Sequence, residues 1–267
     1  MCFSMKTYSF YGLPVSDVSK TSIYDFFKKA IIKNNNTVIY GYSLYAIYAI
    51  RKIPEIYTLG KQAALFLTDG RPFYWLCKIA KLPLTDGISI PECVMLALNF
   101  ANEYGLKVML IGATAKVNKE ANENIRKKFK KAIILEGHHG YFNTIDEEAE
   151  LIKKVNCEQP DILLVGISSP KKERFVFNNA SALKAKIVIP CGGMIDVLAG
   201  KTKMTPRWLK RIGLASFYRV IQEPKRLLFD RLKMIWFLLV DFFPKFLINA
   251  VVRRKNFSIP ALYIKEN

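Results

Sequence analysis

Asp69 is the carboxylate that the sequence places best for acid–base chemistry. It lies in Leu67-Thr68-Asp69-Gly70, directly after the compact apolar run 63–67, a pattern typical of a strand that enters a loop. A carboxylate at the end of a strand can be partly desolvated and still open to a cleft. Such a group can accept the proton of a hydroxyl that attacks the anomeric carbon of an activated sugar. An ordinary Asp-Gly turn is the alternative interpretation.

Glycines at two further strand ends suit a phosphate-bearing ligand. Gly112 follows the apolar run 107–111, and Gly192 and Gly193 follow the run 187–190. Without a side chain, such residues let backbone amides approach a diphosphate closely. The chain contains neither a GxGxxG fingerprint nor a Walker loop, so a nicotinamide-dependent oxidoreductase lacks its signature here.

Positive charge for a departing diphosphate comes from two regions. Ser169, Lys171 and Lys172 offer a hydroxyl and two cations at a helix start, although a capped helix start explains them equally well. Arginines in the last third of the chain could neutralise the same group, with a solvated basic face as the alternative. These arginines are Arg211, Arg219, Arg226 and Arg231.

The sequence favours no metal and no cofactor. His138 and His139 are adjacent in a Gly-flanked segment, and no array of carboxylates or cysteines stands nearby to complete a coordination shell. A turn is therefore the favoured interpretation of this pair. No DxD pair stands at a strand end to hold a cation on a nucleotide diphosphate.

Alternating strand and helix patterns predict the fold that positions these residues. The predicted strands are 36–39, 63–67, 107–111, 132–135, 161–166 and 187–190, and the predicted helices are 44–53, 89–104, 118–131, 145–155 and 172–178. This alternation predicts a Rossmann-like α/β core at residues 1–200, with a mostly parallel sheet and helices on both faces. Ligands of such sheets bind at the carboxyl ends of the strands, where Asp69 and the glycines fall.

Residues 201–267 form a basic and aromatic appendage. The chain has a formal net charge of +19, and this segment holds fifteen Lys or Arg against four Asp or Glu, which is 11 of those charges. Its strongly apolar part, 234–252, contains charged residues and a proline, which disfavour a single membrane span. We therefore predict a partly helical appendage with an interfacial segment at 234–252 that binds anionic lipid, beside Arg253, Arg254 and Lys255.

Other features of the composition predict a cytoplasmic location. The first thirty residues contain Asp17, Lys20 and Asp25 without a long apolar core, which argues against a signal peptide or an N-terminal anchor. The five cysteines are scattered without the spacing of a zinc site or a disulfide framework, as expected in a reducing compartment. They are Cys2, Cys77, Cys93, Cys157 and Cys191.

Several motifs agree in order, spacing and type with a known family over about residues 60 to 232. They are Thr68-Asp69-Gly70, the segments 105–112, 137–142 and 160–173, Gly192-Gly193 with Asp196, and 199–201. The most specific block runs from Gly213 to Arg226 and ends in Gln222-Glu223-Pro224-Lys225-Arg226. In these motifs the chain resembles the WecG/TagA/CpsF glycosyltransferases, glycosyltransferase family 26, whose typical members add N-acetylmannosamine or its uronic acid to a lipid-linked sugar.

This resemblance implies a hexosyltransferase that is inverting and independent of metal. It implies a UDP-sugar donor, an acceptor sugar on undecaprenyl diphosphate, a role in cell-surface polysaccharide synthesis, and a peripheral position on the inner face of the plasma membrane. Asp69 matches the family's proposed catalytic base. Arg219 and Arg226, with Arg231, match arginines by which the appendage binds the diphosphate. Nucleic acid is not an expected partner, and homo-oligomerisation stays open.

Departures from the family pattern concern the substrates. Tyr40-Gly41-Tyr42 stands where the family usually has Thr-x-Asn, and Glu92 stands where it has an Asp near the acceptor; we assign Tyr40, Tyr42 and Glu92 to the acceptor side. Lys172 replaces the family's Gln.

The alternative function is a non-catalytic basic protein at a membrane or on nucleic acid, since aromatic residues mixed with arginines suit single-stranded nucleic acid.

Overall fold

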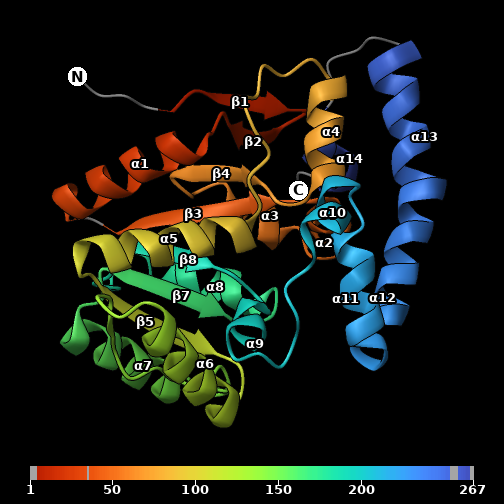
Figure 1. Cartoon of the computed structure of the whole chain (residues 1–267). Coiled ribbons are helices and arrows are strands. Elements are labelled where there is room, and N and C mark those ends of the chain that lie inside the picture. Colours follow the sequence, from red (N-terminus) through yellow and green to blue (C-terminus); the bar gives the residue numbers. More distant parts are fainter. Residues whose placement is uncertain (1–4, 35, 253–257, 265–267) are drawn as a thin grey trace.

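A parallel sheet forms the centre of the molecule. The computed structural model describes residues 5–34, 36–252 and 258–264. The strands of the sheet are β3 Thr37–Tyr42, β4 Leu65–Thr68, β5 Lys107–Gly112, β6 Ile133–Ile134, β7 Ile162–Gly166 and β8 Ile187–Pro190. Within the described residues these six pair in the order β4-β3-β8-β7-β5-β6 (Figure 1). A separate antiparallel hairpin joins β1 Thr7–Phe10 to β2 Leu13–Ser16.

Both faces of the sheet are covered, because successive side chains of a strand pack into different apolar layers. On β5, Val108 and Leu110 contribute to one layer, whereas Met109 and Ile111 contribute to the other. The first layer is completed by helices α1 Lys20–Lys33, α5 Ile90–Tyr104, α6 Ala115–Lys128 and α9 Met194–Leu198. The second is completed by α2 Leu44–Lys52, α3 Glu55–Gly60, α7 Ile145–Glu158 and α8 Lys171–Asn178. The predicted Rossmann-like α/β fold is confirmed.

Most predicted elements lie within a few residues of the observed ones, and the differences have local causes. Strand β3 continues past the predicted end at residue 39, because Tyr40 and Tyr42 pair with β4 and are buried. Helix α6 begins before the predicted residue 118, because the Thr114 side chain accepts a hydrogen bond from the Val117 amide and caps the helix there. Helix α4, Arg71–Ile79, was not predicted.

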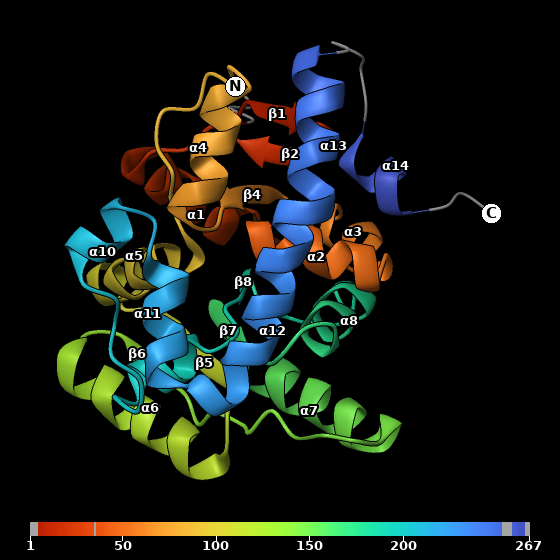
Figure 2. The ribbon, with the colours of Figure 1, turned by 90° about the vertical axis from the view of Figure 1, so that its right-hand side faces the viewer.

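The C-terminal segment is helical and packs on the body. It comprises α10 Arg207–Arg211, α11 Ala215–Gln222, α12 Pro224–Phe237, the π-helical turns η1 Leu238–Phe242 and η2 Leu247–Val252 around α13 Phe243–Phe246, and α14 Ile259–Tyr263. Figures 1 and 2 show α12 and α13 as one long rod along the side of the body. Its inner face belongs to the same apolar layer as α2, through Met234, Phe237, Leu238, Phe242 and Phe246. From α12 onward the predicted appendage therefore shares its core with the body.

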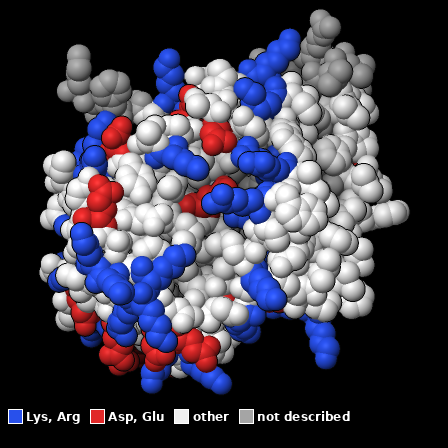
Figure 3. Space-filling view, in the orientation of Figure 1, with Lys and Arg blue, Asp and Glu red and all other residues white. Residues whose placement is uncertain are grey.

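The outer face of this rod is apolar and exposed. Ile235, Trp236, Leu239 and Val240 all point to solvent, and the right-hand side of Figure 3 is correspondingly poor in charge. In the part of the chain that the structure describes, no helix is both long and apolar enough to span a bilayer. The basic cluster predicted at 253–255 lies outside the described residues.

The two faces of the rod predict different costs of truncation. Phe242 is 0% exposed, and its ring packs at a tilt against the rings of Phe237 and Phe246. Trp236, in contrast, is 70% exposed. We expect Phe242→Ala to lower the free energy of unfolding by about 3–5 kcal/mol, because it leaves a cavity in the shared core. Trp236→Ala, the matched control, should change it by less than about 1 kcal/mol. Urea denaturation of the whole chain measures both; equal effects would contradict a shared core.

Candidate active site

Two neighbouring elements hold Asp69 in place at the end of β4. Its amide donates to the carbonyl oxygen of Tyr42 at 2.7 Å, which continues the pairing of β3 with β4. Its Oδ1 accepts from the amide of Ile90, the first residue of α5, at 3.0 Å. Helix α5 begins there because Ser89 and Glu92 form a capping box. The carboxylate therefore lies at the positive end of a helix, where a negative charge is stabilised.

The surroundings of Asp69 act on its pKa in opposite directions. Burial raises the pKa of this partly exposed carboxyl above its ordinary value, and the negative charge of Glu92 adds to the effect. The Ile90 amide and the positive charges of Lys172 and Arg219 lower it. The result is a carboxyl with raised proton affinity that lies beside cations, which is the character required of a general base.

The guanidinium of Arg219 on α11 occupies space next to Gly193 that any larger residue at that position would fill. Its Nη2 lies 3.5 Å from the carbonyl oxygen of Gly193, which follows β8. A Cβ on Gly193 would lie 2.3 Å from that nitrogen, so any side chain there would displace the guanidinium. Gly192 adopts a φ of +52° and a Cβ there would meet no atom within 4 Å, so this glycine faces open space. The two glycines therefore leave room for the Arg219 guanidinium next to Gly193 and for open space next to Gly192.

Arg231 of α12 is a second arginine whose charge is coupled to that of Asp69. Its guanidinium carbon lies 4.1 Å from the ring centroid of Tyr45, and burial lowers its pKa. Among the described residues, the buried Nε atoms of Arg219 and Arg231 have no hydrogen-bond partner. Since buried donors normally have one, these two suit the oxygens of an anionic ligand.

A buried carboxylate beneath the site escaped the sequence analysis. Glu173 is 0% exposed, and its Oε1 accepts from the hydroxyls of Tyr40 at 2.8 Å and Ser169 at 2.9 Å. The ammonium of Lys172 lies 3.3 Å from the same oxygen. Glu173 therefore orients Lys172, the cation nearest in sequence. Nothing in the segment 168–173 distinguishes a buried glutamate from an exposed one at a helix start.

These residues form a site at the carboxyl ends of the strands, in which one partly exposed carboxylate lies among Lys172, Arg219 and Arg231. The sequence matches the model of the glycosyl transferase WecG/TagA/CpsF family over residues 8–255. The chain belongs to the WecG/TagA/CpsF family. It is therefore a glycosyltransferase, as the resemblance implied, and a non-catalytic protein is no longer a competing interpretation.

Curated relatives of this family member come from Staphylococcus aureus. A protein of strain MRSA252 is 26% identical over 215 residues, which cover 77% of this chain and 83% of the relative. Its name is N-acetylglucosaminyldiphosphoundecaprenol N-acetyl-beta-D-mannosaminyltransferase. Relatives of strains MW2 and NCTC 8325 have the same name, identity and coverage. By these names the relatives act on a sugar that a diphosphate links to undecaprenol.

Two of the residues predicted for the donor side, Gly112 and Lys171, make contacts within the body of the protein. The Gly112 amide donates to the carbonyl of His138, and a Cβ there would lie 2.4 Å from the Gly166 oxygen, so Gly112 is required for the close packing of β5 on β7. Lys171 donates to the carbonyl of Phe142 and lies over its ring. These contacts give both residues a structural role, and their role in donor binding stays a prediction.

The residues predicted for the acceptor side have different surroundings. Tyr40 and Tyr42 are buried, and burial together with the charge of Glu173 raises the pKa of Tyr40 well above its ordinary value. Neither ring is placed to touch an acceptor, because β3 continues through both and turns them into the core. Glu92 is partly exposed and accepts from the Ser89 amide at 3.0 Å.

Of the remaining predicted arginines, Arg226 shares the carboxylate of Glu223 with Arg219, whereas Arg211 lies elsewhere. Arg226 pairs with Glu223 and its side chain is half exposed. Arg211 lines a pocket beside α5, together with Glu92. Helical spacing in the sequence did not predict which of these arginines lie together, because their positions depend on how α10 and α12 pack on the body.

The histidine pair lies in a loop that pairs with β5. His138 donates its amide to Leu110, and its Nδ1 lies 2.7 Å from the carbonyl oxygen of His139. Burial lowers the pKa of His138, which favours the neutral ring. Across the described ranges, no group of three or more His, Cys, Asp or Glu is placed to hold a metal ion.

Charge changes around Asp69 predict opposite shifts of the acidic limb of the pH–rate profile. With Asp69 as the predicted base, activity should be lost as the pH falls through the pKa of this carboxyl. Lys172→Met removes a charge that lowers this pKa, so the loss should begin at higher pH; Glu92→Gln removes a charge that raises it, so the loss should begin at lower pH. Lys171→Met, the neighbouring control, should leave the limb in place. The measurement is kcat/KM for sugar transfer against pH, and parallel shifts in all three variants would contradict the assignment.

Proposed function

We propose that this glycosyltransferase moves N-acetylmannosamine, or a related hexose or hexuronic acid, from a UDP-sugar to a sugar linked to undecaprenyl diphosphate. The reaction serves the synthesis of a cell-surface polysaccharide. The observation that carries the proposal is the partly exposed carboxylate of Asp69 at the end of β4, beside Lys172, Arg219 and Arg231. The names of the Staphylococcus aureus relatives support this choice of sugar and acceptor.

In the proposed step, Asp69 takes the proton of the acceptor hydroxyl as its oxygen attacks the anomeric carbon of the donor. The bond from this carbon to the diphosphate oxygen breaks, and its electron pair leaves with the nucleotide. Arg219, Arg231 and Lys172 stabilise the charge that develops on the diphosphate, and the proposal therefore assigns no metal to this task. A single displacement inverts the configuration at the anomeric carbon.

Asp69 is a better base than the other carboxylate of the site. Glu173 is buried, and Tyr40, Ser169 and Lys172 already surround its Oε1, so an acceptor hydroxyl cannot reach it. Asp69 makes one hydrogen bond through Oδ1 and remains partly exposed. Glu173 is accordingly a positioning residue that holds Lys172.

Asp69→Asn should abolish transfer without loss of the fold. The amide keeps the shape of the side chain and can still accept from Ile90, but it cannot take a proton, so we expect kcat to fall by about 10²–10⁴-fold. Transfer from a panel of UDP-sugars to N-acetylglucosamine on a short-chain lipid diphosphate measures this. Asp25→Asn, on the exposed side of α1, is the control. Activity of Asp69→Asn within a few-fold of the parent would refute the base.

The apolar outer face of the C-terminal helices suits a membrane that carries the acceptor. Large side chains are exposed along α10, α11 and α12, among them two tryptophans, which favour the interface between lipid and water. The exposed residues are Trp208, Ile212, Phe217, Ile221, Phe229, Leu232, Trp236 and Leu239. With the excess positive charge of this segment, they support a peripheral position on anionic lipid at the inner face of the plasma membrane.

Vesicle binding tests this surface. We expect Trp208→Ala together with Trp236→Ala to weaken partitioning onto phosphatidylglycerol vesicles by at least about tenfold, because both side chains leave the bilayer interface. Ile145→Ala is the control, since Ile145 is equally exposed but lies on α7. Co-sedimentation at two salt concentrations measures partitioning, and unchanged binding of the tryptophan variant would exclude this face.

A further inference from the structure

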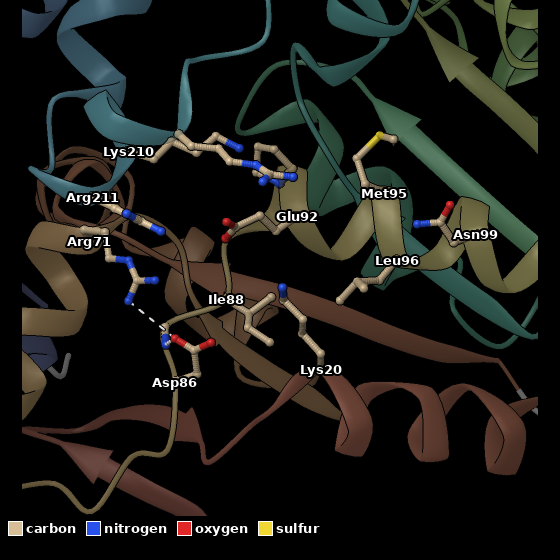
Figure 4. Close-up of a pocket in the computed structure, with 13 residues that line it drawn as sticks. Lys20, Arg71, Asp86, Ile88, Glu92, Met95, Leu96, Asn99, Lys210 and Arg211 are labelled. Atoms are coloured by element: carbon tan, nitrogen blue, oxygen red, sulfur yellow. Dashed lines mark hydrogen bonds and ion pairs between the residues drawn. The ribbon is translucent and has the colours of Figure 1, made fainter. Parts of the chain in front are cut away.

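A pocket of about 480 Å³ lies beside the Asp69 site, between the start of α5 and the short helix α10. Its apolar floor includes Ile88, Met95 and Leu96. Its rim is basic, and in Figure 4 the ammonium of Lys20 and the guanidinium of Arg211 approach Glu92 from different sides. The cations that line it come from three separate segments: Lys20, Arg71, Arg207, Lys210 and Arg211.

These cations outnumber the acids of the pocket. Asp86 and Glu92 are its carboxylates, so five positive and two negative charges leave three in excess. Arg71 pairs with Asp86 at 3.4 Å. The other four cations have no ion-pair partner in the ranges that the structure describes. Like charges gathered in one hollow repel each other, so the pocket is suited to an anion of more than one negative charge.

The pocket adjoins the proposed base through α5. Ile90 donates its amide to Asp69, and its neighbours Ile88 and Pro91 line the pocket. Glu92 lines the pocket as well, and its charge raises the pKa of Asp69. A ligand anchored here can therefore present an attached group to Asp69 without passing through the body.

The proposed reaction brings together two substrates that each carry a diphosphate. One group of cations includes Arg219, beside Gly193 at the end of β8, and a second lines the pocket at the start of α5, whose Ile90 amide contacts Asp69. One cluster can bind the diphosphate that departs, and the other can bind the diphosphate that stays on the acceptor. We infer that the pocket between α5 and α10 binds the diphosphate of the lipid-linked acceptor, an inference that rests on the proposed function.

The surface next to the pocket favours the acceptor over the donor. Lys210 and Arg211 line the pocket, while Trp208 and Ile212 on the same turns of chain are exposed. A lipid chain attached to a diphosphate in the pocket can therefore run directly onto the apolar outer face of α10 and α11. A nucleoside would gain less from that face than a wholly apolar lipid chain, because its ribose and the edges of its base need polar partners.

Kinetics of variants distinguish the two sources of diphosphate. In the whole chain, we expect Lys210→Ala with Arg211→Ala to raise KM for N-acetylglucosamine on a short-chain prenyl diphosphate by at least about tenfold, with KM for the UDP-sugar within about twofold. Lys203→Ala, an exposed cation of the same segment outside the pocket, should change neither. A rise confined to the donor KM, or no rise in either, would overturn the inference. Lys210→Arg with Arg211→Lys should retain the acceptor KM and serves as the check that charge is responsible.

A binding measurement separates this inference from the proposed function. Titration of the protein with the same short-chain prenyl diphosphate sugar can be followed by tryptophan fluorescence in the absence of donor. Loss of this binding in the Lys210→Ala, Arg211→Ala variant supports the pocket as the site of the acceptor diphosphate. This conclusion holds even if the parent chain transfers no sugar, because absence of transfer would refute only the proposed function. Equal binding by parent and variant overturns the pocket whatever the transfer activity.

Discussion

The proposed chemistry of this protein depends on one carboxylate, Asp69, whose desolvation is balanced by nearby cations. Burial favours protonated Asp69, while the Ile90 amide, Lys172 and Arg219 favour the ionised form. A fully exposed aspartate would be too weak a base, and a fully buried one would be neutral and inaccessible. The intermediate position follows from β4, which ends at Thr68, and from α5, whose first amide faces the carboxylate.

The order of the strands gathers the remaining groups around that carboxylate. Strands β4, β3, β8 and β7 are neighbours, so their carboxyl ends bring Asp69, Gly193 and the start of α8 to one edge. The arginines come from the other end of the sequence. Because the rod that carries Arg231 shares Phe237 and Phe242 with the core of the body, the cations are as firmly placed as the sheet itself. Binding of charge and stability of the fold therefore depend on the same packing.

The sequence predicts the fold well because buried parallel strands and amphipathic helices have distinct periodicities. It also places Asp69 at the end of a strand, because a polar residue directly after an apolar run marks where a buried strand ends. It does not predict which side chains turn inward. Tyr40 and Tyr42 end in the core because β3 is two residues longer than its apolar run, and Gly112 is explained by the close approach of Gly166. Glu173 and the basic pocket depend on which distant segments come together, such as the starts of α1 and α10 around one pocket, for which local patterns carry no signal.

Glu92 links the proposed acceptor pocket to the base electrostatically. It lines the pocket and raises the pKa of Asp69, while the five cations around it partly offset its charge. A diphosphate in the pocket would bring further negative charge close to Glu92 and Asp69, so the affinity of Asp69 for a proton would rise. The base would then be strongest when the acceptor hydroxyl is present. Arg219 and Lys172, on the donor side, act in the opposite sense and keep Asp69 ionised until that proton arrives.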